Sequence, residues 1–329
     1  MSTAGLLRDR NVLWLAGVVV LGIVVAFGVR DAVILDLFFT LLIYAVLGQS
    51  WNWVSGYAGN ISFGHAIFFG CGAYAAAIAT ARFGISPWFA FPIAAVVAAM
   101  LALAVGYPTF ALRGHYFSIA TIAVGALVET FVKTQPYLGR ANGFELPIAN
   151  GLGALQFADK WPYVLLALAL FTIAQGSTIA LERSRIGYYL RALRANFGAA
   201  ASVGIDERKW KLLAFAASAM LASAAGVLYA QYTLFVDPPS TLALPISIDI
   251  ALVGVVGGIG TLWGPPVGAL VYVVLAKAVA LQLGGGGKGY DLVIYGALIV
   301  VIAAVRPSGI VGATIEALRK RRAVRGASV

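Results

Sequence analysis

Residues 51–77 read W-N-W-V-S-G-Y-A-G-N-I-S-F-G-H-A-I-F-F-G-C-G-A-Y-A-A-A, a segment long and apolar enough to cross a bilayer. Its middle holds three glycines, Gly56, Gly59 and Gly64, with polar residues among them. Glycine costs about 1 kcal/mol relative to alanine in a helix interior, and a buried polar group without a partner costs roughly 1–3 kcal/mol. The segment is therefore predicted to break its helix inside the membrane, where such breaks persist only if they line a cavity or are covered by protein.

The polar residues of this break are Asn60, Ser62 and His65. Ser62 is expected to cap a second half-helix that begins between Phe63 and Ala66. The free N–H groups at the start of that half-helix would face the middle of the membrane, a favourable place for an anionic ligand group. Two interpretations stay open: a break that lines a substrate path, with His65 on it, or a glycine-rich crossing where two helices pack closely.

The composition excludes a soluble protein, because 61% of the 329 residues are hydrophobic and only 11% are charged, whereas a soluble domain is about 25% charged. The net charge of +10 is interpreted as a topology signal and as contacts with lipid or a cytoplasmic partner, and not with nucleic acid. His65 and His115 are the only histidines, and no cluster of potential ligands has metal-binding spacing. The sequence also offers no nucleophile–base pair and no phosphate-binding loop. The chain is therefore not expected to be an enzyme or to hold a cofactor, and any ATP would be hydrolysed by another polypeptide.

About ten transmembrane helices are expected, so the predicted fold is an all-α polytopic membrane protein with a single transmembrane domain over residues 1–329. The expected spans are 12–29, 32–49, 53–81 (the broken one), 86–110, 115–135, 161–181, 212–236, 245–263, 264–283 and 290–306. They form a first group within 12–181 and a second within 212–306. Glu129, deep in the fifth span, is expected to face the substrate path or to pair with a neighbour such as Lys277.

The charges of the loops predict which side of the membrane each loop faces. Segment 182–211 and the tail 307–329 are rich in arginine and lysine, so both are expected in the cytoplasm. Loop 136–160 has a balanced charge and is expected outside. Both termini are then cytoplasmic.

A second broken element is predicted at 254–268, which reads G-V-V-G-G-I-G-T-L-W-G-P-P-V-G. Its glycines loosen the chain, and Pro265 and Pro266 can occupy the first turn of a new helix. The pattern is similar to G-Y-A-G-N-I-S-F-G-H-A-I-F-F-G at 56–70. Two similarly interrupted segments in the two halves of a membrane protein suggest an internal inverted repeat whose interface forms the substrate path.

The basic segment 182–211 is predicted to hold a short helix from about Gly187 to Asn196 and a second around Ala199–Ser202, closed by Gly204. Arg191 and Arg194 lie three residues apart and are expected to share a helix face. A compact basic helix pair between spans suits docking to a soluble subunit, and the alternative is a charged loop that only sets the topology.

The chain resembles the LivM-type permease subunits of branched-chain amino acid ABC importers. Four sets of residues carry the resemblance in family order: S-G-Y-A-G-N-I-S-F-G-H-A-I-F-F-G-C-G-A-Y at 55–74, L-R-G-H-Y-F-S-I-A-T-I-A at 112–123, R-A-L-R-A-N with A-A and G-I at 191–205 followed by K-L-L-A-F-A-A-S-A at 211–219, and V-V-G-G-I-G-T-L-W-G-P-P-V-G-A at 255–269.

The resemblance implies an importer of branched-chain or related amino acids in the bacterial inner membrane, although members of the family also carry urea, amides and other small polar solutes. It implies a second, LivH-type permease subunit, two cytoplasmic subunits that bind ATP and Mg, an external substrate-binding protein and surrounding lipid. A less favoured alternative is a gradient-driven secondary carrier.

The resemblance also assigns residues to two sites. The substrate path is expected to include Asn60, Ser62, Phe63, Gly64, His65, Gly260, Thr261 and Trp263. Region 187–205 is expected to be the coupling loop that enters a groove on the ATP-binding subunit, through Arg191, Arg194, Asn196, Ala199, Gly204 and Ile205.

Overall fold

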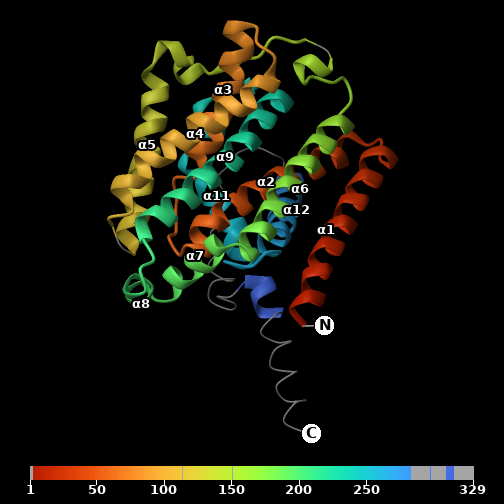
Figure 1. Cartoon of the computed structure of the whole chain (residues 1–329). Coiled ribbons are helices and arrows are strands. Elements are labelled where there is room, and N and C mark those ends of the chain that lie inside the picture. Colours follow the sequence, from red (N-terminus) through yellow and green to blue (C-terminus); the bar gives the residue numbers. More distant parts are fainter. Residues whose placement is uncertain (1–2, 113, 150, 283–296, 298–308, 315–329) are drawn as a thin grey trace.

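A computed structural model shows the chain as a bundle of long helices (Figure 1) and describes residues 3–112, 114–149, 151–282, 297 and 309–314. The helices of the bundle are α1 (Thr3–Gly28), α2 (Ala32–Trp51), α3 (Ala66–Phe83), α4 (Pro87–Thr109), α5 (His115–Thr134), α6 (Trp161–Arg183), α9 (Glu207–Thr233), α11 (Leu244–Gly257) and α12 (Gly264–Gln282). The short helices are α7 (Arg185–Ala195), α8 (Phe197–Ser202) and α10 (Pro238–Thr241).

Within the described ranges, eight helices are long and apolar enough to cross a membrane, and Gly264–Val279 of α12 forms a shorter apolar helix. An all-α polytopic membrane protein is therefore confirmed. The expected spans from 12–29 to 264–283 each correspond to a helix, and the tenth, 290–306, lies outside the described residues.

The helix starts follow local chemistry. The Asp31 carboxylate accepts a hydrogen bond from Val33 N at 2.7 Å, and the Asp206 carboxylate accepts one from Lys209 N at 3.1 Å. Each carboxylate satisfies an N–H group that has no partner inside its own helix, which places the starts of α2 and α9. Pro87 begins α4 in the first turn, where its missing N–H costs nothing.

The core forms where α9 crosses α3, since the two helices approach closely at glycines from both sides. A Cβ atom on Gly72 of α3 would overlap the backbone carbonyl of Ser223, and one on Gly226 of α9 would overlap that of Phe69. Small residues at helix crossings let two backbones approach, which is how helices pack in a membrane. The glycine-rich crossing considered for 51–77 thus lies at Gly72, after the interruption.

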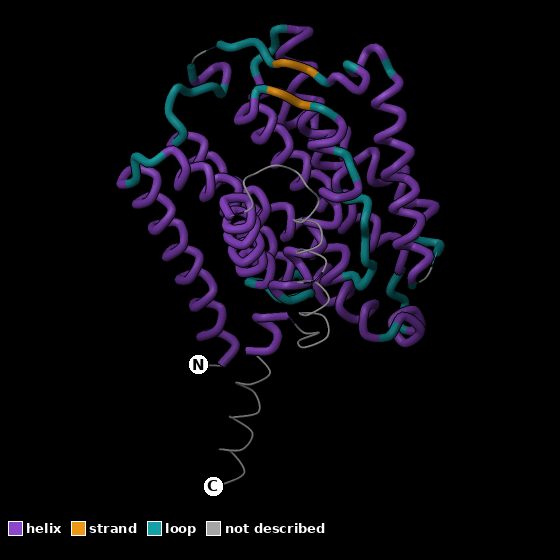
Figure 2. The backbone as a smooth tube through the Cα atoms, turned by 180° about the vertical axis from the view of Figure 1, so that it is seen from behind, coloured by secondary structure: helices purple, strands orange, loops and turns teal. Residues whose placement is uncertain are grey.

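The two ends of the bundle carry different structures. At one end, strands β1 (Phe144–Glu145) and β2 (Phe235–Val236) pair antiparallel, with Phe144 opposite Val236 (Figure 2). At the other end lie the beginning of α1 and helices α7 and α8 (Figure 1). The loops 136–160 and 182–211 are therefore on opposite faces, as their charges predicted.

The charged side chains within the spans pair differently from the expectation. Glu129 forms an ion pair with Lys133 one turn later, at 2.5 Å. Lys277 pairs with Asp36 at 3.2 Å, and the Tyr232 hydroxyl donates to the same carboxylate at 2.6 Å. The pairing of Glu129 with Lys277 was therefore wrong, because Asp36 and Lys277 face each other across α2 and α12 while Glu129 finds a cation on its own helix.

Candidate functional site

The first interruption covers residues 58–65, and it begins one turn later than the sequence indicated. Helix α2 continues as a π-helix, η1 (Asn52–Tyr57), in which Ala58 N bonds to Trp53 O at 3.2 Å. Residues 53–57 therefore extend the preceding span, which runs from Ala32 to Tyr57, and do not open a new one. The wider π turn keeps the backbone bonded up to the glycines, and such turns often mark functional sites.

The polar backbone of this interruption is paired with side chains from several helices. Trp51 Nε1 donates to Ser62 O at 2.7 Å, from the end of α2. On α5, the Ser118 hydroxyl donates to Ile61 O at 2.7 Å, and the Thr121 hydroxyl accepts from Phe63 N at 3.1 Å. A non-helical segment is stable in a membrane only when it is satisfied in this way. The predicted break is confirmed, and it is held in one conformation.

The capping role expected for Ser62 was wrong. Helix α3 begins at Ala66, and His65 precedes it without a side-chain cap. Ala66 N donates to the Ser247 hydroxyl of α11 at 2.9 Å, while the Ser62 hydroxyl accepts from Gly64 N at 3.4 Å. Ser62 lies four residues before the helix, too far to reach the second or third N–H, and a neighbouring helix supplies the hydroxyl instead.

His65 is completely buried. The Ser218 hydroxyl donates to Ser50 O at 2.7 Å, so at its contact of 2.8 Å with His65 Nε2 it accepts the ring N–H. This bond places a proton on Nε2, and Nδ1 has no partner within the described part of the chain. The ring also lies against Phe68 and Phe215. In this conformation His65 packs the core between α3 and α9.

The second interruption covers residues 258–263, between α11 and α12, and it lies against the first. Asn52 joins the two: its Oδ1 accepts from Gly260 N at 2.7 Å, and its Nδ2 donates to Thr261 O at 3.0 Å. Gly260 and Thr261 are thus brought to the first interruption. Trp263 is not, because its Nε1 points to Asn11 Oδ1 on α1 at 3.3 Å.

The sequence analysis did not identify Asn52 as a residue of the site. The signal that could have found it is an amide side chain inside an apolar run, which needs a partner if buried. Its partners lie more than 200 residues further along the chain, with sequence separations of 208 and 209.

The two interrupted stretches run side by side in the same direction. A Cβ atom on Gly48 would lie 2.6 Å from Val253, and further along both helices Asn52 reaches Gly260. In each stretch one helix leads into the interruption and the next helix leads back from it: α2 and α3 in the first stretch, α11 and α12 in the second. An inverted repeat would place its two interrupted segments in opposite directions, so the parallel course of these two stretches does not support the predicted inverted repeat.

The basic segment folds into the two predicted short helices. The Ser184 hydroxyl accepts from Gly187 N at 3.2 Å and begins α7, and Asn196 Oδ1 accepts from Ala199 N at 3.1 Å and begins α8. Gly204 closes the pair with a φ of +83°. Ala199 and Gly204 are exposed and Ile205 is half-buried, so α8 presents small residues to solvent.

The two arginines of α7 have different partners. Arg191 binds carbonyls near the start of its own helix, Glu182 O at 2.9 Å and Gly187 O at 3.2 Å. Arg194 instead reaches the bundle and donates to Gly56 O in η1. Although Arg191 and Arg194 lie three residues apart on α7, their guanidinium groups bind different parts of the chain.

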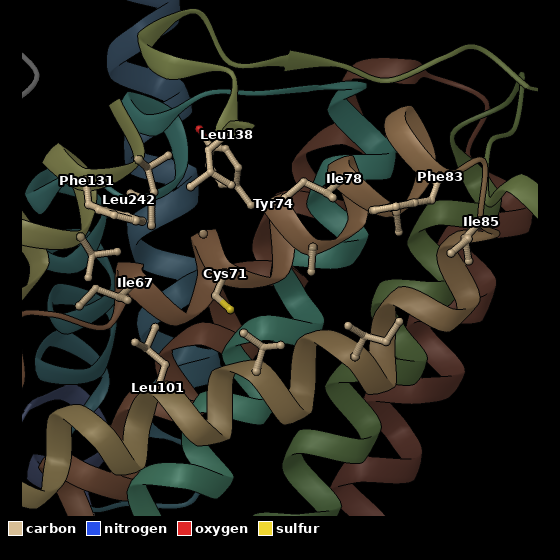
Figure 3. Close-up of a pocket in the computed structure, with 17 residues that line it drawn as sticks. Ile67, Cys71, Tyr74, Ile78, Phe83, Ile85, Leu101, Phe131, Leu138 and Leu242 are labelled. Carbon is tan, nitrogen blue, oxygen red and sulfur yellow. The ribbon is translucent and has the colours of Figure 1, made fainter. Parts of the chain in front are cut away.

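A cavity of about 630 Å³ lies between α3, α4 and α5 (Figure 3). Its walls are apolar, with Cys71, Leu101 and Phe131 among the lining side chains. Tyr74 also lines the cavity and carries a hydroxyl group. No charged side chain of the described residues lines it. A zwitterion would lose its hydration there and gain no charged partner among the described residues, so this cavity is not the candidate site. In the part of the chain that the structure describes, no three potential metal ligands lie close enough to hold an ion.

A bundle of membrane-crossing helices with two interrupted stretches held against each other defines a multi-pass membrane transport protein. The chain belongs to the family described as the permease component of branched-chain amino acid transport systems, whose sequence pattern matches residues 33–303.

Curated relatives agree with this family. The chain is 28% identical to the high-affinity branched-chain amino acid transport system permease protein LivM of Escherichia coli, over 96% of this chain and 79% of that protein. It is also 28% identical to LivM of Salmonella typhimurium, over 84% of this chain and 70% of that protein. It is 26% identical to LivH of Escherichia coli, over 82% of this chain and 91% of that protein. No solved structure matches the chain.

Proposed function

We propose that this chain is the permease subunit of an ATP-driven importer that moves branched-chain or related amino acids into the cytoplasm, with the whole chain as one transmembrane domain. The observation that carries the proposal is the family match over 33–303, which includes both interruptions and the helix pair α7–α8. The names of the LivM and LivH relatives support the substrate class.

The substrate path is assigned to the two interruptions, near 60–65 and 259–264, where this chain would meet a second, LivH-type permease subunit. In the chain alone, Gly59 and Ile61 are exposed and Gly260 and Thr261 are half-buried, so the interruptions reach the surface that a partner would cover. Asn60 Oδ1 is buried without a hydrogen-bond partner among the described residues. The ammonium group of an amino acid would supply the missing donor.

The remaining partners are assigned to the two ends of the bundle. Of two ATP-binding subunits, which would carry the ATP and Mg, one docks on α7–α8 at the cytoplasmic face and the other on the second permease subunit. A substrate-binding protein docks on the external loop, where Ile148 and Leu152 are 80% and 74% exposed. Apolar side chains that stand so far into solvent favour contact with another protein. Lipid surrounds the spans in the bacterial inner membrane, and both termini lie in the cytoplasm.

The test is to purify the tagged chain in mild detergent with the proteins that accompany it, reconstitute the complex in liposomes, and measure uptake of labelled leucine with and without ATP on the side of α7–α8. ATP-dependent uptake with isoleucine and valine as competitors is the expected result. Competition by urea or amides alone would change the substrate class. Uptake by this chain by itself, driven by an ion gradient without ATP, would refute the importer.

A further inference from the structure

The Arg194 side chain crosses from α7 into the gap between the two interruptions. Its guanidinium donates to Gly56 O in η1, just before the first interruption. A Cβ atom on Gly59 would lie 3.0 Å from Arg194 Cγ, and one on Gly260 would overlap Arg194 Nη1. The arginine is therefore bounded by the first interruption on one side and the second on the other.

The sequence provides this gap through two glycines. Gly59 and Gly260 have φ angles of +78° and +76°, a left-handed conformation that other residues rarely adopt. Each glycine thus meets two requirements at once: the backbone turn needs a positive φ, and the arginine needs the space that a side chain would fill. Because both conditions coincide at both positions, the gap is part of the fold and not a gap left by poor packing.

Further hydrogen bonds join the same three segments. Asn52 ties the second interruption to η1, as described above. At the other end of η1, the Tyr57 hydroxyl donates to Glu182 Oε1 at 2.7 Å, and Arg191 donates to Glu182 O. Glu182, at the end of α6, therefore joins η1 to α7, and Arg194 brings α7 to Gly56 and to the second interruption.

We propose that Arg194 is a positioning residue that links the coupling helix α7 to both interruptions, so that a displacement of α7 is passed to the substrate path. This inference rests on the proposed function, in which ATP-binding subunits move α7. A charged donor on a backbone carbonyl forms a strong, directional bond. When α7 moves, Arg194 either carries Gly56 and Gly260 with it or leaves the gap, and both outcomes change the spacing of the two interruptions.

The first experiment compares uptake with ATP hydrolysis in the reconstituted complex. Arg194→Gln removes the charged donor but keeps a polar side chain that can still be solvated. Leucine imported per ATP hydrolysed is expected to fall about tenfold, within the usual range for residues that couple two sites, while ATP hydrolysis continues. Arg194→Lys keeps the charge without the planar fork and is expected to retain an intermediate ratio.

Arg208→Gln is the matched control. Arg208 lies on the first turn of α9 at the same face of the membrane and stacks over the Tyr107 ring, away from both interruptions. Its loss removes the same charge and is expected to leave the ratio unchanged.

A second variant tests the same gap at Gly260, on the side of the second interruption. Gly260→Ala places a methyl group against Arg194, so it is expected to lower the same ratio. In an Arg194→Ala background it is expected to add no more than the effect of the strained backbone at this positive φ, because the residue it displaces is already gone. Gly84→Ala is the control for backbone strain, since Gly84 has a φ of +61° and no atom within 4 Å of a Cβ position.

The outcomes separate the two proposals. If the wild-type complex shows no ATP-driven uptake, the importer is refuted and the linkage with it. If the wild-type complex imports leucine and Arg194→Gln keeps the wild-type ratio, only the linkage is refuted. Additive losses in the double variant would refute it as well. Size-exclusion elution of each complex shows that the variants assemble, and if Arg194→Gln does not assemble, Arg194→Lys and Gly260→Ala give the result.

Discussion

At the scale of single residues, the structure gives His65 a packing role in the observed conformation. The imidazole is fully buried, donates to Ser218 and contacts two phenylalanine rings. The sequence left substrate contact and packing equally open, because a histidine beside a glycine-rich break fits both. Its burial supports packing in this conformation, and contact of His65 with substrate stays a prediction, since a side chain without exposed surface contacts a solute only after the helices around it separate.

Replacing this histidine should therefore reduce stability before it changes substrate choice. His65→Ala removes the hydrogen bond to Ser218 and leaves a cavity beside Phe68, so the free energy of unfolding is expected to fall by about 2–4 kcal/mol. Thermal unfolding in detergent, followed by loss of the monodisperse elution peak, measures the change. His115→Ala is the control, because His115 is exposed and its loss is expected to cost less than about 0.5 kcal/mol. Equal melting temperatures for the two variants would contradict the packing role.

At the scale of elements, the bundle depends on how closely α3 and α9 approach. Helices in a membrane gain little from the hydrophobic effect between themselves, so close backbone packing supplies much of their attraction. Gly72 and Gly226 bring each backbone against a carbonyl of the other helix. The interruption precedes this crossing directly, so the crossing fixes the height and direction of the segment that begins α3.

Two glycine-to-alanine substitutions should change stability in opposite directions. Alanine is favoured over glycine by about 1 kcal/mol inside a helix. At Gly226 the new methyl group would overlap Phe69 O, and such overpacking costs about 1–3 kcal/mol, so Gly226→Ala is expected to lower the melting temperature. At Gly176 of α6 no atom lies within 4 Å of the Cβ position, so Gly176→Ala is expected to keep or raise it. A Gly226→Ala protein as stable as wild type would show that the crossing is looser than described.

The elements were predictable to the extent that they depend on local sequence. Apolar runs predicted the spans, and glycines among polar residues predicted both interruptions. The π-helix that extends α2 was not predicted, and two further features depend on residues distant in sequence: the Ser247 hydroxyl at the start of α3 and the Arg194 contact with Gly56. The last two pairs are separated by 181 and 138 residues. A sequence pattern shows that a polar group needs a partner, but only the packed bundle shows which partner it finds.

At the scale of the whole molecule, function requires the two ends of the bundle to face different compartments. The end with α7 and α8 carries the basic segment, and the end with the two-stranded sheet carries the loop with exposed Ile148 (Figures 1 and 2). Positive charge accumulates on the cytoplasmic side of bacterial membrane proteins, so a cytoplasmic position of α7–α8 is the prediction to be tested. The interruptions lie nearer this end, since Arg194 reaches Gly56 directly.

Thiol labelling tests this orientation. In a Cys71→Ser background, Ile148→Cys is expected to react with a membrane-impermeant maleimide in intact cells. Val203→Cys, which replaces a residue 74% exposed next to α8, is expected to react only after permeabilisation or in inverted vesicles. Expressing the chain without its proposed partners keeps an ATP-binding subunit from covering Val203. Labelling of both positions from the outside would place α7–α8 on the wrong side for ATP-driven import, because ATP is available only in the cytoplasm. The reverse pattern would require an outward orientation of both termini and would exclude α7 as the contact for cytoplasmic subunits.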